Sequence, residues 1–380
     1  MVEEKEVISI IFDLGSFNWK IGLTGNDKPS QFFKPYILEK LINNNNNEYD
    51  YIYNINEFNN HLDYNPLSIM NINKGNFFKN FELFENYFDF ILNNLNNLNL
   101  DDDILNHPFI FSEPCLCDKK VRMKLTEFLF EKYKIPSFFL CNYEVLSSFA
   151  FGKITCLIFD SGHNQTLAAP VNDGMVIKKS IKKSEVNGNF INEKLNKIIT
   201  NKFNINFHLK YNNDYSFENL LSEIKEKYIN YCDNLEEENQ NNNFEYILPD
   251  NNLIKLDTKI RNNLIDNCFK NNENNYSNLI LSSINSVEID IKKELCNQIC
   301  LCGGNTILSN NFDEKIKNDI TNQVSNSTIV KVTKHEKEYR TYTSWLGASI
   351  LGSINNFSEN LIKKEEYEEH GSIIIERKCA

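Results

Sequence analysis

The chain has 380 residues, of which 41% are hydrophobic and 24% charged, a composition typical of globular proteins with more than one domain. Its 52 acidic and 40 basic residues give a formal net charge of −12, which argues against a general electrostatic grip on phosphates, so we expect no direct nucleic-acid binding. No apolar run reaches the roughly 18 residues of a membrane helix, and the acidic N-terminus does not resemble a secretory signal. We therefore expect a soluble intracellular protein that does not associate with membranes.

The ten cysteines do not have the spacing of a metal site. The close pairs, Cys115/Cys117 and Cys300/Cys302, have one intervening residue each, which is too few for a zinc knuckle. We expect reduced and mostly buried thiols.

The first predicted elements are a strand, its return strand and two helices. Apolar β-branched residues predict a buried strand over 7–12, and the turn after it predicts a return strand over 19–23. Apolar residues at helical spacing predict helices over 80–98 and 119–133. Asparagine tracts that cannot bury apolar surface predict solvated loops at 43–47, 93–94, 96–97, 241–243 and 271–272.

A second strand is predicted over 154–159, and it runs into an acidic turn like the first one does. Each unit is an apolar strand, an aspartate, a Gly/Ser turn and a return strand. The two aspartates, Asp13 and Asp160, are about 147 residues apart. This repetition predicts duplicated α/β lobes that face each other across a cleft.

Both turns have the chemistry of a polyphosphate site. Gly15 lets the backbone bring N–H groups toward an anion, Ser16 adds a hydroxyl donor, and Lys20 adds a positive charge. The second turn would hold the other side of the phosphates, and Asp13 and Asp160 would organise the waters of a bound Mg²⁺. Alone, each turn fits an ordinary β-turn, and the glycine pair after residue 302 fits a plain strand-to-helix turn. The occurrence of two such acidic turns in one chain indicates a phosphate-binding site.

Six segments in order resemble actin and the actin-related proteins over nearly the whole chain. They are the turn regions 13–25 and 160–162, the segments 107–114 and 303–304, and the C-terminal segments 345–351 and 376–379. The resemblance implies an actin-like duplicated ATPase fold, with ribonuclease H-like lobes in four subdomains around a nucleotide cleft. The implied bounds are 1–34, 75–150 and 343–380 for subdomain 1, 35–74 for subdomain 2, 151–186 and 275–342 for subdomain 3, and 187–274 for subdomain 4.

The resemblance also implies a site for ATP or ADP with Mg²⁺. The cofactor-binding residues carried over are Asp13, Gly15, Ser16, Phe17, Asn18, Lys20, Asp160, Ser161 and Gly162 toward the phosphates and cation, and Gly188, Lys225, Glu226, Gly303, Gly304 and Asn305 toward the adenosine. By itself, the 217–230 helical pattern would make Lys225 and Glu226 a solvated charged face. Thr341 replaces a lysine that lies near the adenine in actin.

Three replacements predict that bound ATP is hydrolysed poorly. In actin, a glutamine and a histidine orient the attacking water and relay its proton; the aligned residues here are Tyr143 and Leu167. Leucine can neither accept a proton nor hold a water, and tyrosine is a poor base at neutral pH. His163 replaces an acidic residue of the second turn. We expect a nucleotide that acts mainly as a clasp between lobes.

Within the family, 119–136 and 375–379 resemble the nuclear actin-related protein 4 branch. This implies a nuclear subunit of chromatin-remodelling or histone-acetylating complexes, paired with actin or another actin-related protein on a helical segment of a Snf2-type remodelling ATPase. Such a helix would lie in the groove between subdomains 1 and 3. Tyr133, Leu146, Ile350 and Leu351 are either contacts for it or core residues.

Two alternatives stay open. A divergent cytoskeletal actin would assemble with nucleotide turnover; Leu167, the asparagine-rich stretch 41–60 and the altered segment 308–311 count against it. A sugar kinase or chaperone-type ATPase shares the fold, but this chain has actin-like C-terminal segments and no evident catalytic carboxylate for a second substrate.

Overall fold

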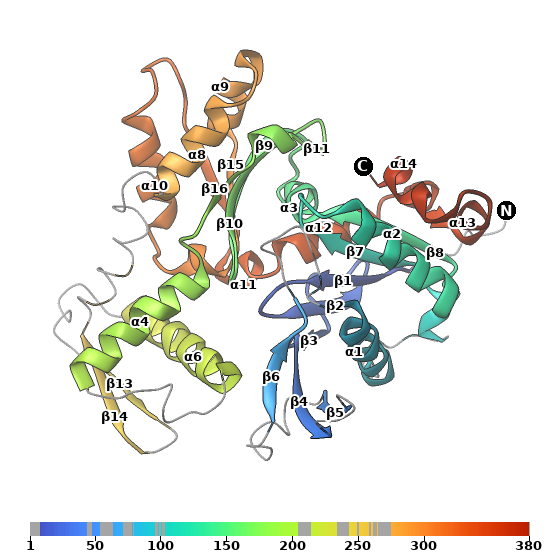
Figure 1. The fold of residues 1–380 in the computed structure, drawn as a ribbon. Helices are drawn as coiled ribbons and strands as arrows, with labels where there is room; N and C mark the ends of the chain where they lie inside the picture. The colour runs from blue at the N-terminus through green and yellow to red at the C-terminus, as the bar shows by residue number, and fades with distance from the viewer. Residues whose placement is uncertain are drawn as a thin grey trace.

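The computed structural model describes residues 8–43, 48–53, 64–70, 78, 80–95, 98, 100, 103–203, 214–233, 243–248, 251–257, 260, 264 and 275–379. They form two lobes side by side, each built on a six-stranded sheet (Figure 1). No helix in these ranges is both long and apolar enough to span a membrane.

The sheet of the first lobe has the strand order β17-β8-β7-β1-β2-β3. Its strands are β1 Ile10–Leu14, β2 Trp19–Leu23, β3 Gln31–Phe33, β7 Phe109–Glu113, β8 Ser137–Asn142 and β17 Ile362–Lys363. β1 pairs antiparallel with β2 and parallel with β7, so both of its faces are covered and its five residues are all buried. The predicted hairpin is confirmed, although the strand begins at Ile10 and Val7 lies outside the described residues.

The sheet of the second lobe repeats this arrangement. Its strands are β9 Cys156–Ser161, β10 Thr166–Asn172, β11 Met175–Val176, β12 Lys182–Ser184, β15 Ile299–Cys302 and β16 Val332–Lys334. β9 lies between an antiparallel return strand, β10, and a parallel neighbour, β15, as β1 lies between β2 and β7. The duplicated lobes predicted from the two acidic turns are therefore present.

Each lobe carries a smaller sheet at the same end of the molecule (Figure 1). The first lobe has β4 Tyr36–Asn43, β5 Glu48–Ile52 and β6 Asn65–Ser68; the second has β13 Asn243–Ile247 and β14 Leu253–Asp257. β5 falls inside the asparagine-rich stretch 41–60 and pairs with β4. β4 ends at Asn43, so the first residue of the loop predicted over 43–47 is strand instead. Residues 44–47 and 54–60 lie outside the described part. We keep the four-subdomain bounds as a proposal.

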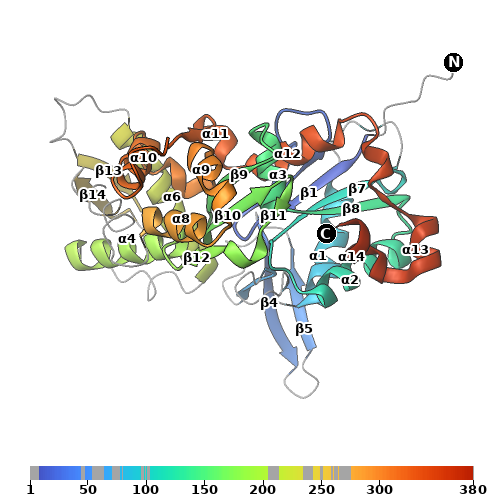
Figure 2. The ribbon, with the colours of Figure 1, turned by 90° about the horizontal axis from the view of Figure 1, so that it is seen from above.

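The α-helices of the described chain lie on the sheets and between the lobes (Figures 1 and 2). They are α1 Phe81–Asn94, α2 Lys119–Glu127, α3 Tyr143–Ala150, α4 Gly188–Phe203, α6 Asp214–Asp233, α8 Tyr276–Asn285, α9 Ile289–Asn297, α10 Phe312–Thr321, α11 Lys337–Arg340, α12 Thr343–Gly352, α13 Lys364–His370 and α14 Ile375–Lys378.

Two helix predictions need correction. The helix predicted over 80–98 is α1, which ends at Asn94, so the asparagine pair 93–94, which also predicted a loop, forms its last turn. The buried residues of α1 belong to the core of the first lobe. The single helix predicted over 119–133 ends at Glu127, and a π-helical turn, Phe128–Lys132, continues it. Phe128, Leu129 and Phe130 are all buried in this wider turn.

The described cysteines have the predicted environment. Seven of them are buried, and Cys117 is partly exposed, with no disulfide among them. Cys156, Cys300 and Cys302 form one apolar cluster on β9 and β15. They therefore act as small core residues.

The chain passes from the first sheet to the second through α3 and returns through α12. These helices pack backbone against backbone, because a Cβ added to Gly347 of α12 would lie 1.7 Å from the carbonyl oxygen of Leu146 on α3. Only glycine permits this approach. Figure 1 shows both helices at the junction of the two lobes.

Replacing Gly347 with alanine should lower the free energy of unfolding by about 1–3 kcal/mol, because the two helices must separate. Chemical denaturation followed by circular dichroism measures this. Gly304→Ala is the matched control, since no atom lies within 4 Å of its added Cβ. Equal stability of the two variants would contradict the packing described.

Candidate functional site

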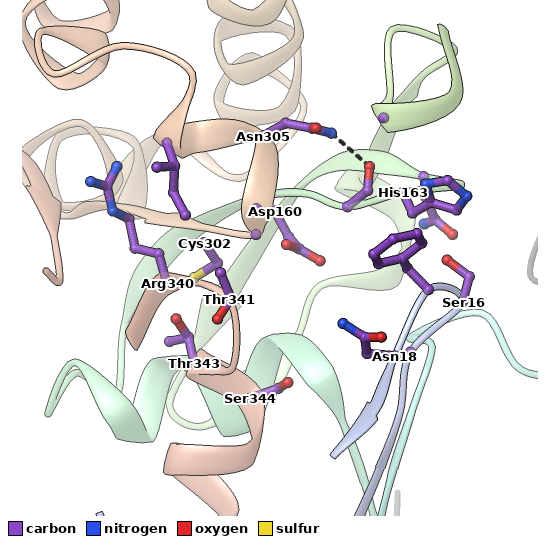
Figure 3. Close-up of a pocket in the computed structure, with 18 of the residues that line it drawn as sticks. Ser16, Asn18, Asp160, His163, Cys302, Asn305, Arg340, Thr341, Thr343 and Ser344 are labelled. Carbon is purple, nitrogen blue, oxygen red and sulfur yellow. Dashed lines mark hydrogen bonds between the residues drawn. The ribbon is translucent and has the colours of Figure 1, made fainter. Parts of the chain in front are cut away.

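A pocket of about 540 Å³ lies between the two lobes, a size within the range of about 300–1,000 Å³ common for ligand sites. Of the predicted cofactor-binding residues, those that line it are Asp13, Gly15, Ser16, Phe17, Asn18, Lys20, Asp160, Gly162, Gly188, Lys225, Glu226, Gly303, Gly304 and Asn305. Ser161 is the exception. Figure 3 shows Ser16 and His163 on one side of the pocket and Arg340 on the opposite side.

Asp13 is the most constrained side chain of the first turn. It is almost completely buried at the end of β1, and Lys20 on β2 pairs with its Oδ2 at 3.0 Å. Two hydroxyls also donate to it, Ser112 at 2.6 Å and Ser344 at 2.9 Å. These partners hold an ionised carboxylate at a fixed position beside the pocket.

Asp160 occupies the equivalent position in the second lobe but has a different environment. Its carboxylate makes no hydrogen bond to the described residues, and burial raises its pKa to about 6, with Lys20 opposing the shift. A half-buried carboxylate without a hydrogen bond, at the wall of a pocket, is one that a cation or its waters can satisfy. Asp13 and Asp160 therefore differ in role: one is already paired and the other is available.

Ser161 lies behind the pocket wall, where its hydroxyl is completely buried. It is 2.7 Å from the Thr166 hydroxyl and accepts a hydrogen bond from Asn305 Nδ2 at 3.2 Å. It therefore supports the turn instead of facing the pocket. Asn305 also donates to the carbonyl of Gly162 at 2.7 Å, which fixes the third glycine segment against the second turn.

Gly303 is required where the third segment meets the second turn. Its φ is +85°, and an added Cβ would lie 2.3 Å from the Ser161 carbonyl oxygen and 2.4 Å from Asp160 Oδ1. Its N–H donates to the carbonyl of Arg340 at 3.0 Å. The backbone of this segment therefore approaches the pocket without a side chain in between.

The residues predicted for the adenosine side come from three separate elements. Gly188 begins α4, and its N–H donates to the carbonyl of Gly162 at 3.0 Å. Lys225 and Glu226 lie on α6, the lysine buried and the glutamate exposed. Thr341, which replaces the expected lysine, also lines the pocket. The structure thus brings these residues to the pocket walls.

The three positions predicted to lack hydrolytic groups also line the pocket. The Tyr143 hydroxyl donates to the carbonyl of Leu14 at 2.6 Å, and burial raises its pKa well above the usual value. Leu167 is buried on β10 opposite Asp160 on β9. The ring of His163 packs on Phe17 with centroids 4.8 Å apart, and burial lowers its pKa.

Sequence reasoning missed a buried carboxyl group in this pocket. Glu144 follows Tyr143 at the start of α3 and is 1% exposed, and burial raises its pKa to about 8. The Cys115 thiol lies next to it, yet neither carboxyl oxygen has a hydrogen-bond partner of normal geometry in the described part of the chain. Glu144 is the one charged residue of the helical stretch 143–150, and this was the available signal.

The other residues that the sequence did not reveal hold the predicted site residues in position. Ser112 and Ser344 hold Asp13, and Arg340 Nη1 donates to the carbonyl of Thr306 beside the third segment. Their sequence separations from Asp13, 99 and 331 residues for the two serines, hid these contacts from any local pattern.

The side chains of the pocket fit a nucleotide whose phosphates would supply part of the coordination of Mg²⁺. Within the described ranges there is no cluster of three or more His, Cys, Asp or Glu side chains able to hold a metal directly. Mg²⁺ commonly keeps several waters and binds proteins through one or two carboxylates together with substrate phosphates. Asp13 and Asp160, with Lys20 between them, match that requirement.

Two lobes of the same topology, each contributing an acidic turn to one shared pocket, define a protein of the actin-like fold. A family model described as "Actin" matches residues 4–380, nearly the whole chain. The chain belongs to the actin family.

Individual relatives agree with this assignment. "Putative actin-29" of Dictyostelium discoideum is 29% identical over an alignment of 388 residues, which covers 98% of this chain and 97% of the relative. "Actin-related protein 4" of Arabidopsis thaliana is 26% identical over 326 residues, or 73% of each chain. "Actin-related protein 4" of Oryza sativa subsp. japonica is 28% identical over 316 residues, which covers 72% of this chain and 71% of the relative.

Proposed function

We propose that this actin-family protein binds ATP or ADP with Mg²⁺, hydrolyses it poorly, and serves as a scaffold subunit of a nuclear chromatin-remodelling or histone-acetyltransferase complex. The observation that carries the proposal is the pocket itself. It keeps the phosphate-side and adenosine-side residues of the family together, while its two hydrolytic positions hold Leu167 and Tyr143. Similarity to proteins named actin-related protein 4 supports the choice of complex.

Nucleotide binding would use the two turns from opposite sides. Ser16, Asn18 and Lys20 would meet the phosphates from the first lobe, and the backbone around Gly162 from the second. Asp13 and Asp160 would hold the waters of Mg²⁺. Gly188, Lys225, Glu226, Gly303, Gly304 and Asn305 would surround the adenosine.

Replacing Lys20 with alanine should weaken nucleotide binding about 10- to 100-fold, because a charged donor to phosphate is worth about 1.5–3 kcal/mol. It should also remove the ion pair at Asp13 Oδ2, which keeps the hydrogen bond from the Ser344 hydroxyl. Titration with a fluorescent nucleotide analogue measures the affinity. The exposed Lys28→Ala variant is the control and should bind like the wild type.

Poor hydrolysis follows from the lack of a proton acceptor at the two positions that align with the hydrolytic residues of actin. Leu167 has no polar atom, and Tyr143 uses its hydroxyl to donate to Leu14. Glu144 could replace them, but with a pKa of about 8 it keeps its proton at pH 7. His163 Nε2 faces Glu218 on α6 at 3.9 Å. Neither aligned position, nor Glu144, can therefore take the proton of an attacking water at pH 7, and the His163 ring packs on Phe17 instead of occupying either position.

ATP turnover should therefore stay far below roughly one per second at pH 7. Single-turnover assays with radiolabelled ATP measure it directly. The double variant Leu167→His, Tyr143→Gln restores an imidazole and an amide at the two positions and should hydrolyse faster than the wild type. A wild-type rate near one per second would contradict this part of the proposal.

The scaffold role depends on a surface that can accept a partner helix. Ile350 on α12 is 40% exposed and Leu351 is partly exposed, so both remain candidate contacts. Leu146 is wrong as a contact: it is completely buried against α12, and its carbonyl meets Gly347. Tyr133 packs on Phe88 and Phe128, although part of its side chain is accessible.

The test is to identify proteins that copurify with the tagged chain from gently lysed cells. Recovery of a Snf2-type remodelling ATPase together with actin would support the scaffold proposal. Replacing the exposed Ile350 with aspartate should then reduce that recovery, while Ile354→Asp serves as a control at a similarly exposed position. Recovery of the chain alone, or of filament-binding factors, would overturn the proposal.

A divergent cytoskeletal actin is the second candidate function. It is favoured by one observation: the similarity to "Putative actin-29" covers 98% of this chain, whereas that to the plant actin-related protein 4 sequences covers 72–73%. Sedimentation of the purified protein in the presence of Mg-ATP distinguishes the two. Pelleting that depends on nucleotide would support the cytoskeletal candidate.

A further inference from the structure

A chain of side-chain contacts crosses the pocket at the end away from α3 and α12. It begins where the two turns meet: the ring of Phe17 in the first turn packs on the ring of His163 in the second, with centroids 4.8 Å apart and planes at 43°. Tilted ring pairs at this separation attract one another. The two lobes therefore touch directly through these two rings.

Lys34 adds a cation to this contact from the first lobe. Its Nζ lies 3.2 Å from the centroid of the Phe17 ring. Burial lowers the pKa of Lys34 to about 8, while Glu226 on α6 of the second lobe opposes that shift, so the amine is still charged at pH 7. A partly desolvated ammonium on a ring face is a favourable arrangement.

The contacts continue to the smaller sheet of the first lobe. His163 Nε2 lies 3.9 Å from Glu218 Oε2 on α6, which is close but beyond hydrogen-bond distance. The same oxygen accepts a hydrogen bond from the Tyr36 hydroxyl at 2.9 Å. Tyr36 begins β4. Tyr36 and Glu218 are 182 residues apart in sequence, so this bond joins β4 to α6 across the interlobe space.

These contacts lie apart from the helix junction that connects the lobes. The pocket residues nearest that junction are Tyr143, Glu144 and Ser147 of α3 and Thr343 and Ser344 of α12. His163 lies on the other side of the pocket from Thr343 and Ser344 (Figure 3), and the ring of Phe17 packs on it. A contact between the lobes that lies far from α3 and α12 resists opening of the lobes more effectively than a contact close to these helices.

We infer that Phe17, Lys34, Tyr36, His163 and Glu218 form a side-chain latch that holds the two lobes closed without a ligand and limits how fast a pocket ligand escapes. The first part depends only on the contacts above. The second part rests on the proposed nucleotide binding. The nucleotide would then be retained by the latch, rather than being the sole clasp between lobes.

Two variants open the latch with small changes. Tyr36→Phe removes one oxygen and its bond to Glu218; losing a hydrogen bond to a carboxylate corresponds to about a ten-fold change in an equilibrium. Phe17→Leu keeps apolar bulk but removes the ring that both Lys34 and His163 contact. Tyr64→Phe is the matched control, because its hydroxyl bonds to Asp50 within the small sheet of the first lobe.

The ligand-free measurement is small-angle X-ray scattering of nucleotide-stripped protein, with circular dichroism to confirm folding. Wild type and Tyr64→Phe should keep the same radius of gyration with and without Mg-ADP. Tyr36→Phe and Phe17→Leu should expand when stripped and become compact again when Mg-ADP is added. Expansion of the stripped wild type to the same radius as the variants would overturn the latch.

The exchange measurement is the dissociation rate of a fluorescent ADP analogue chased with unlabelled ADP. The rate should rise about ten-fold in Tyr36→Phe and remain unchanged in Tyr64→Phe. Equal rates in all three proteins would overturn the exchange part. Complete absence of nucleotide binding in the wild type would contradict the proposed function, while the scattering of the stripped proteins would still decide whether the latch exists.

Discussion

Replacing Arg122 with methionine should lower the free energy of unfolding by about 3–5 kcal/mol, the usual effect of breaking a buried ion pair by removing one partner. Arg122 on α2 is 6% exposed, and its Nε bonds to the buried Glu113 on β7 at 3.0 Å. Its other nitrogens donate to Glu376 and to the carbonyl of Cys379. The substitution therefore leaves Glu113 unpaired and releases the C-terminal segment.

The matched control is Lys119→Met on the same helix. Lys119 pairs with Glu376 at 3.0 Å, but its side chain is 77% exposed, so its loss should cost under about 1 kcal/mol. Chemical denaturation of the wild type and the two variants at pH 7 measures the difference. Similar stabilities for the two variants would show that the buried network does not anchor the C-terminal segment.

Replacing Glu144 with glutamine should stabilise the protein increasingly as the pH rises. Burial raises the pKa of Glu144 from 4.5 to about 8 in the folded protein. Below pH 4.5 both folded and unfolded chains hold the proton, so the group has no effect. Between pH 4.5 and 8 the unfolded chain loses the proton first, so wild-type stability falls by up to about 1.4 kcal/mol per pH unit.

Glutamine resembles the neutral acid and does not titrate, so the difference between variant and wild type should grow from near zero at pH 4.5 to about 4 kcal/mol at pH 8. Urea denaturation at several pH values in this window measures it. Glu245→Gln on β13, an exposed position, is the control and should change stability by under about 0.5 kcal/mol at every pH. A difference for Glu144→Gln that does not vary with pH would contradict the burial of an unpartnered carboxyl.

The repeated strand-and-turn units were the most predictable part of the fold. Five consecutive buried residues in β1 and the apolar run of β9 carry a strong local signal, because strands buried on both faces are apolar throughout. The aspartate one residue before the end of each strand then reaches the same pocket because the lobes are duplicates. For the same reason the phosphate-side residues could be predicted from short segments.

What the sequence did not reveal depends on contacts between distant segments. Ser344 bonds to Asp13 across 331 residues, and no local pattern distinguishes it from other serines of a helix start. The role of Leu146 was ambiguous because apolar residues at helical spacing serve equally as core or as interface. Leu146 is buried because Gly347 lets α12 pack directly against its backbone. Ser161 was carried over with its neighbours, although its side chain faces inward.

The backbone contact between α3 and α12 also determines how the lobes can move. Surfaces that meet through interlocked side chains can slide in small steps as rotamers change, but Gly347 and the Leu146 carbonyl leave no such layer between them. Both helices also share one apolar cluster with β1 and β7 of the first sheet, so the contact locks the outgoing and returning segments of the chain to each other and to the first lobe. The second lobe is therefore joined to the first at one place, and a change in the angle between the lobes must occur where these two segments leave the first lobe.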